Sequence, residues 1–169
     1  PPIAADAIFW CYAGLSVGDL CSGLLSQRLR SRKRAVASFL VLTVVAVTYY
    51  FTIGPSSETA FKVGCFLCGL GSGYWAVFVT MAAEQFGTNL RATVTTSAPN
   101  FVRGTVPVLI TAYELLRDAR LDPSSGAAAR GIGPVAAAIV VGVVVLAIAF
   151  LMLRGLRETY ARDLDFVEH

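Results

Sequence analysis

Residues 91–116 read RATVTTSAPNFVRGTVPVLITAYELL and place Arg103 halfway along an apolar stretch that is long enough to cross a bilayer. A charged side chain at the bilayer centre is costly, so it normally faces water, a partner charge or a substrate instead of lipid. The polar residues recur at steps of three or four, so a helix would carry them in one stripe: Thr93, Thr96, Asn100, Arg103, Pro107, Thr111 and Glu114. The stretch therefore predicts a membrane helix with one lipid or protein face and one wet face.

The composition predicts an integral membrane protein. Of the 169 residues, 56% are hydrophobic and only 15% are charged, and the mean hydropathy is +0.66. The net charge of +3 comes largely from one basic cluster, which indicates membrane topology and argues against nucleic acid as a partner. The chain begins at Pro1 with neither Met nor a basic segment before an apolar one, so we expect a fragment of a longer protein.

Five segments have the roughly 20 mostly apolar residues that a spanning helix needs. They are approximately residues 3–26, 35–53, 59–83, 92–116 and 132–153, followed by a tail, 154–169. Five of the seven residues from Arg28 to Arg34 are basic, and the positive-inside rule assigns this connection, and with it the tail, to the cytoplasm. The second and fifth segments carry no charge. We therefore expect an all-α bundle around a central path, with these two helices outside.

Two pairs of glycines have the spacing G-x-x-x-G. Gly14 and Gly18 lie in the first segment, and Gly69 and Gly73 in the third. Small residues at this spacing allow helices to approach closely. Close packing and a gating hinge are both open interpretations.

No catalytic constellation is found in the sequence. The single histidine, His169, is the last residue, which argues against His-based catalysis and His-rich metal sites. No Gly-rich phosphate loop is followed by Lys, so direct use of ATP is not indicated. Cys65 and Cys68 form a lone C-x-x-C inside an apolar segment, where a thiol most often behaves as a small hydrophobe. We expect neither an enzyme nor a cofactor.

Three stretches, in the same order along the chain, resemble the major facilitator superfamily of transporters. Residues 23–34, GLLSQRLRSRKR, resemble the basic inner loop of that family, with Gln27 and Arg30 where its pattern has Asp and the second Gly. Residues 83–93, AEQFGTNLRAT, resemble the Glu-x-Phe-Pro-Thr-x-x-Arg motif of sugar- and organic-anion-transporting members, with Gly87 in place of the Pro. Residues 158–165, ETYARDLD, resemble its short cytoplasmic tail.

The resemblance implies that the five segments are helices eight to twelve of a twelve-helix transporter, most of its C-terminal six-helix half, with the preceding helices of the same chain absent. It implies a multi-pass protein of a bacterial inner membrane, with a cytoplasmic C-terminus. It also implies secondary active transport of a small polar metabolite, a sugar or an organic anion, by alternating access and with proton symport. The alternative is a membrane-embedded interaction or assembly subunit without transport activity.

Two charged residues inside the predicted spans are the main candidates for the substrate and proton pathway. Arg103 could bind an anionic group of the substrate through its planar guanidinium, pair with a carboxylate such as Asp19, or extend toward the membrane surface. Asp19 could load and release a proton as access alternates, or hold a basic residue in place. Further candidates for substrate contact are Tyr12, Trp75 and Asn100.

A cytoplasmic gate is expected at the inner ends of the helices. Glu84 and Arg91 lie at that boundary, which favours gate ion pairs over substrate ligands. The full set of candidate gate residues is Gln27, Arg28, Arg32, Glu84 and Arg91.

Overall fold

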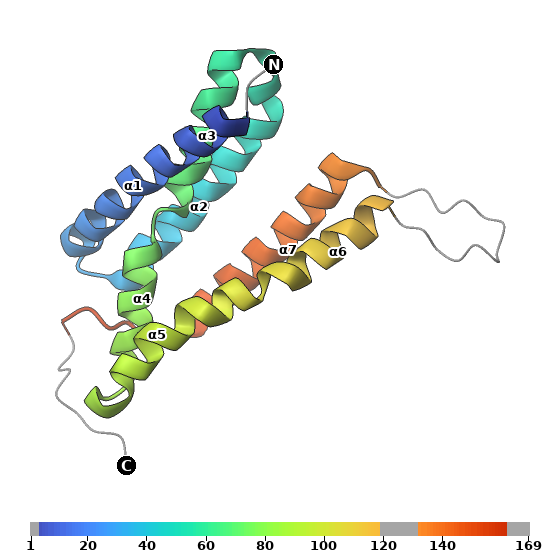
Figure 1. Ribbon diagram of the computed structural model, residues 1–169. Coiled ribbons are helices and arrows are strands. Elements are labelled where there is room, and N and C mark those ends of the chain that lie inside the picture. The colour runs from blue at the N-terminus through green and yellow to red at the C-terminus, as the bar shows by residue number, and fades with distance from the viewer. Residues whose placement is uncertain (1–3, 119–131, 162–169) are drawn as a thin grey trace, which may run out of the picture. The chain divides into compact units, whose positions relative to one another are not determined.

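The computed structural model describes residues 4–118 and 132–161, and within these ranges the protein is helical and has no strand. Figure 1 shows the helices in chain order. They are α1 (Ala4–Leu29), α2 (Arg32–Thr52), the short 3₁₀ helix η1 (Gly54–Ser56), α3 (Glu58–Ser72), α4 (Trp75–Glu84), α5 (Thr88–Gly104), α6 (Val106–Asp118) and α7 (Pro134–Gly155).

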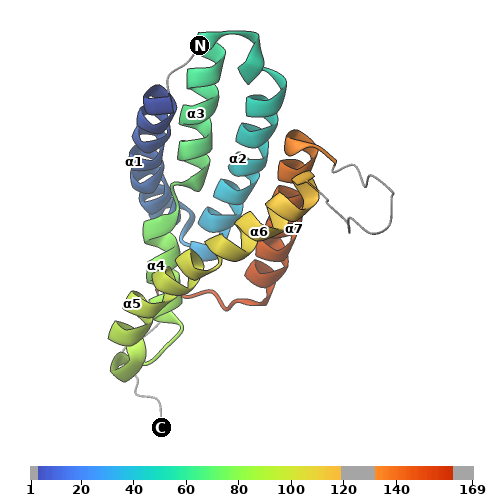
Figure 2. The same cartoon turned by 45° about the vertical axis from the view of Figure 1, so that its right-hand side comes forward.

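The chain divides into two compact units. The first comprises Pro1–Thr95 and Gly155–His169, and the second comprises Thr96–Arg154. In the first unit, α1, α2 and α3 lie side by side (Figures 1 and 2). Its core is formed by apolar residues of α2, α3 and α4, including Phe39, Leu40, Cys65, Val77 and Met81.

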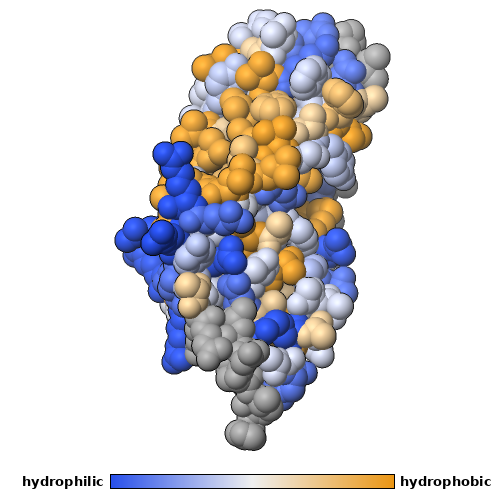
Figure 3. All heavy atoms as spheres, turned by 90° about the vertical axis from the view of Figure 1, so that its left-hand side faces the viewer, coloured by the Kyte–Doolittle hydropathy of each residue, from blue (hydrophilic) through white to orange (hydrophobic). Residues whose placement is uncertain are grey.

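Four helical segments are long and apolar enough to cross a membrane, which indicates an integral membrane protein. They are Ala4–Leu29, Arg32–Ser56, Glu58–Glu84 and Pro134–Gly155. Apolar side chains are exposed along them, and Figure 3 shows a broad apolar zone on one face of the molecule. Such a surface is expected where a protein meets lipid.

The prediction of five spans is not confirmed, because the segment 92–116 is not among the four. It is divided between α5 and α6 at Thr105. Pro107 has no backbone N–H to bond the Arg103 carbonyl, so the helical ladder is interrupted here. The polar residues of α5 also lower the hydropathy of this stretch.

The connection predicted between the first two spans is much shorter than residues 27–34. α1 continues to Leu29 and α2 begins at Arg32, so only Arg30 and Ser31 lie between them. Most of the basic cluster therefore belongs to the two helix ends.

The third predicted span, 59–83, is a broken helix. Gly73 and Tyr74 separate α3 from α4, as the ribbon in Figure 1 shows. On each side of this break, a side chain from another helix makes a hydrogen bond to a backbone group. Thr43 of α2 donates its hydroxyl to the Gly71 carbonyl at 2.9 Å, and Asp19 of α1 accepts from the Ala76 backbone N–H at 3.3 Å.

The two glycine pairs form the contact between α1 and α3. A Cβ on Gly14 would overlap the Phe66 carbonyl, and one on Gly69 would overlap the Cys11 carbonyl. Gly18 and Gly73 approach each other in the same way at the break. Close packing is therefore confirmed for both pairs, and it brings Asp19, the neighbour of Gly18, next to the start of α4.

Candidate functional site

The connection between α1 and α2 is a tight corner built from two residues. Arg30 has a φ of 49°, and the Ser31 N–H donates to the Ser26 carbonyl at 3.3 Å, the pattern of a Schellman cap. Ser31 then caps α2, because its hydroxyl accepts from the Arg34 N–H at 3.1 Å. The corner fixes Arg32 as the first residue of α2.

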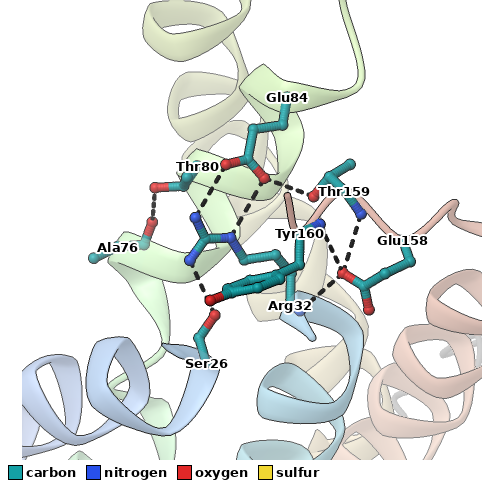
Figure 4. A network of polar contacts seen from close by, with 8 residues as sticks. All are labelled: Ser26, Arg32, Ala76, Thr80, Glu84, Glu158, Thr159 and Tyr160. Atoms are coloured by element: carbon teal, nitrogen blue, oxygen red, sulfur yellow. Dashed lines mark hydrogen bonds and ion pairs between the residues drawn. The ribbon is translucent and has the colours of Figure 1, made fainter. Parts of the chain in front are cut away.

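Arg32 forms a two-point ion pair with Glu84, the last residue of α4. Nη2 of Arg32 lies 3.1 Å from Oε1 of Glu84, and Nε lies 3.4 Å from Oε2. The third nitrogen, Nη1, donates to the Ser26 hydroxyl at 3.0 Å. The two side chains are only 21% and 10% exposed, so the pair is largely shielded from solvent. It joins the ends of α1, α2 and α4 (Figure 4).

Glu158, which follows α7, reaches the first turn of α2. Its carboxylate accepts from the backbone N–H groups of Arg32 at 2.9 Å and Lys33 at 3.3 Å, and from the Ser31 hydroxyl. The first N–H groups of a helix have no partner within the helix, and the helix dipole favours a negative charge there. The cap of α2 is therefore completed by a residue that lies 126 positions after Arg32 in the chain.

The neighbours of Glu158 hold the same corner. Thr159, 1% exposed, donates its hydroxyl to Oε2 of Glu84 at 2.6 Å. The guanidinium carbon of Arg32 lies 5.6 Å from the centre of the Tyr160 ring, within reach of a cation–π contact. We call residues 156–161 the tail segment, and we call Ser26, Ser31, Arg32, Glu84, Glu158, Thr159 and Tyr160 the corner network.

Two side chains also bind backbone carbonyls of the tail segment. Nζ of Lys33 donates to the Leu156 carbonyl at 2.6 Å, and Nε2 of Gln85 donates to the Arg157 carbonyl at 2.9 Å. The segment is thus fixed on one side to the start of α2 and on the other to the end of α4.

The environment of Glu158 favours its charged form. Burial opposes ionisation, but the Ser31 hydroxyl and the N–H groups of Tyr160, Arg32 and Lys33 outweigh it, so the pKa of Glu158 lies below its ordinary value. At neutral pH Glu158 is therefore held as a carboxylate by its own set of donors. These contacts can break and re-form, because the corner network consists of hydrogen bonds, an ion pair and the contact of Arg32 with the Tyr160 ring.

Of the five candidate gate residues, the structure brings Arg32 and Glu84 into contact. Gln27 and Arg28 are exposed on the last turn of α1. Nη2 of Arg91 donates to the Phe86 carbonyl at 3.4 Å, in the turn after α4. The gate assignment of these three residues stays a prediction.

Three candidate pathway residues lie in the first unit. Asp19 is half-buried and binds the start of α4. Trp75 is the first residue of α4, with its ring 5.6 Å from that of Phe78, while Tyr12 is 65% exposed on α1. The structure thus gives Asp19 a definite backbone partner, whereas the proposed substrate contacts of Tyr12 and Trp75 stay predictions.

Arg103 and Asn100 lie in the second unit, on exposed positions of α5. Nη1 of Arg103 is 3.5 Å from Oδ1 of Asn100, one turn earlier. Asn100 and Arg103 therefore lie on one face of α5, while the rest of the predicted stripe stays a prediction. A pairing of Arg103 with Asp19 stays a prediction.

Sequence reasoning did not assign five residues of the corner network to a site: Ser26, Ser31, Glu158, Thr159 and Tyr160. Ser31 lies directly before α2, where serine is a preferred cap, but the predicted span began only at residue 35. Glu158 and Thr159 belong to the tail stretch that resembles the transporter family, but a contact over 126 residues leaves no trace in local spacing.

No protein-family model matches the chain, and neither a curated protein nor a solved structure shows significant similarity to it.

Proposed function

We propose that the chain is part of a secondary active transporter that moves a small polar metabolite by alternating access, and that the corner network is its cytoplasmic latch. The observation that carries the proposal is the Arg32–Glu84 pair with Glu158 and Thr159 beside it. It joins four separate segments at one end of membrane-crossing helices through contacts that can open and close. A protein that only needed stability would gain as much from apolar packing at this place.

Charge placement supports the cytoplasmic side for this latch. The basic residues that flank the α1–α2 corner, Arg28, Arg30, Lys33 and Arg34, are the largest such cluster in the sequence. Positive charge is retained on the cytoplasmic side of a membrane. Closing the helix ends on that side would leave the path open to the outside, and opening them would release the substrate inward.

Within this function, Arg103 is the candidate to bind an anionic or hydrogen-bonding group of the substrate, and Asp19 is the candidate proton carrier. In this proposal α5 and α6 together cross the membrane as an interrupted helix, and a charged residue within such a helix is a functional-site candidate by default. The Asn100 amide beside Arg103 adds a second polar group at the same level.

The test is an uptake assay with the intact protein in proteoliposomes, screened against sugars, carboxylates and amino acids with and without a pH gradient. We expect concentrative uptake of one class, lost in Arg103→Ala and uncoupled from the pH gradient in Asp19→Asn, with unchanged membrane insertion of both variants. Thr48→Val is the control, because Thr48 is exposed on α2, a helix expected outside the path, and its hydroxyl bonds only the Val44 carbonyl of its own helix. If no class is taken up by a correctly inserted protein, the chain is better explained as an assembly subunit.

A further inference from the structure

α4 is a short helix with a carboxylate bonded at each end. At its start, Oδ1 of Asp19 accepts from the Ala76 N–H at 3.3 Å, and at its end Glu84 binds Arg32 and Thr159. Ten residues at 1.5 Å each make the helix about 15 Å long. One end lies at a break inside an apolar segment, and the other lies in the corner network.

The start of α4 has no cap of its own. Tyr74 occupies the capping position and makes no side-chain hydrogen bond to the helix, so the acceptor comes from α1. Aspartate is among the best capping residues, and its charge also suits the positive end of the helix dipole. The close approach of Gly18 to Gly73 is what brings the Asp19 backbone near enough.

α4 is packed along its length in a way that favours movement as one body. Val77, Met81 and Ala83 are buried, with exposed fractions of 3%, 3% and 7%. α4 is separated from α3 by the non-helical residues Gly73 and Tyr74, so its orientation is not dictated by α3. A shift at its start is therefore transmitted to its end.

We propose that Asp19 is a positioning residue, whose carboxylate caps α4 and thereby holds Glu84 in place against Arg32. The inference builds on the latch proposed above and gives it a control point inside the membrane-crossing segments. Loss of the cap frees the first turn of α4, misplaces Glu84, and loosens the first turn of α2 together with the tail segment.

The experiment is hydrogen–deuterium exchange of the intact protein in lipid nanodiscs, which needs no substrate. In Asp19→Ala we expect about fivefold faster exchange in the first turn of α4, the change that loss of a typical cap produces, and faster exchange in the tail segment and the first turn of α2. Asp19→Asn retains an acceptor oxygen of the same reach and should restore the wild-type pattern at all three places. The control is Asp6→Ala on the same helix, because Asp6 bonds Lys62 at 3.4 Å and not α4.

If Asp19→Ala does not fold, the same coupling can be measured by changing Glu84 and following exchange at the start of α4. Coupling between two sites is reciprocal, so Glu84→Gln should speed exchange in the first turn of α4. Faster exchange confined to the first turn of α4 in Asp19→Ala would overturn the coupling. Exchange in the first turn of α4 that is as fast in Asp19→Asn as in Asp19→Ala would overturn the capping role of Asp19. Because neither readout depends on transport, such a failure would leave the uptake result of the proposed function untouched.

Discussion

Arg32 and Glu84, 52 residues apart in the chain, meet in a two-point ion pair at the ends of α2 and α4. The same guanidinium also binds Ser26 and faces the Tyr160 ring, so one side chain touches α1, α4 and the tail segment.

Removing either member of this pair should loosen the corner network. We expect Arg32→Ala and Glu84→Ala each to destabilise the protein by about 1–3 kcal/mol, because a largely shielded charge loses its partner. The double variant should cost less than the sum, with a coupling of about 0.5–3 kcal/mol. The coupling is measured by thermal unfolding of the wild-type protein, the two single variants and the double variant in one detergent. If the two single effects simply add in the double variant, the two side chains do not interact.

The glycines of α1 should respond to alanine in opposite directions. Gly14→Ala places a methyl group against the Phe66 carbonyl and should cost about 1–3 kcal/mol. Gly23→Ala, on the same helix, meets no atom within 4 Å and should stabilise α1 by about 0.5–1 kcal/mol. Unfolding midpoints of the two variants test this, and equal effects would contradict the close contact of α1 with α3.

Arg30→Gly should stabilise the protein by about 1 kcal/mol. The φ of 49° lies in the left-handed region, which costs a residue with a Cβ about that much and which glycine adopts freely. The position is the one where the resembled inner-loop motif has its second glycine. Arg28→Gly is the matched control, because Arg28 lies within the last turn of α1, and there glycine should destabilise.

Acidic pH should release the tail segment from the corner network. The pKa of Glu158 is lowered when the segment is docked, so docking is favoured above the ordinary value of 4.5 and is lost as pH falls through the lower, docked value. A fluorophore on the segment should therefore report release only below about pH 4.5. In Glu158→Gln that acid step should disappear, and a step persisting near the same pH would assign it to another carboxyl.

The sequence predicted the helical class, four of the five spans and the close packing of both glycine pairs, because these follow from hydropathy and spacing. The break at Gly73 and Tyr74 was not predicted. An apolar run has the same hydropathy whether its helical hydrogen bonds are continuous or are interrupted and supplemented by side chains such as Thr43 and Asp19. The connection between α1 and α2 was likewise predicted to be longer than it is. Composition alone cannot distinguish basic residues at the ends of two helices from basic residues in a loop.

Glu158 lies 126 residues after the Arg32 N–H that it caps, and this separation sets the order in which the protein is completed. At a synthesis rate of about 5–20 residues per second, roughly 6–25 s pass between the emergence of the two residues from the ribosome. α1, α2 and α4 can assemble during that interval without the Glu158 cap. The contact of Glu158 with α2 is thus made only after α7 has been synthesised, so a chain that stops before α7 lacks it.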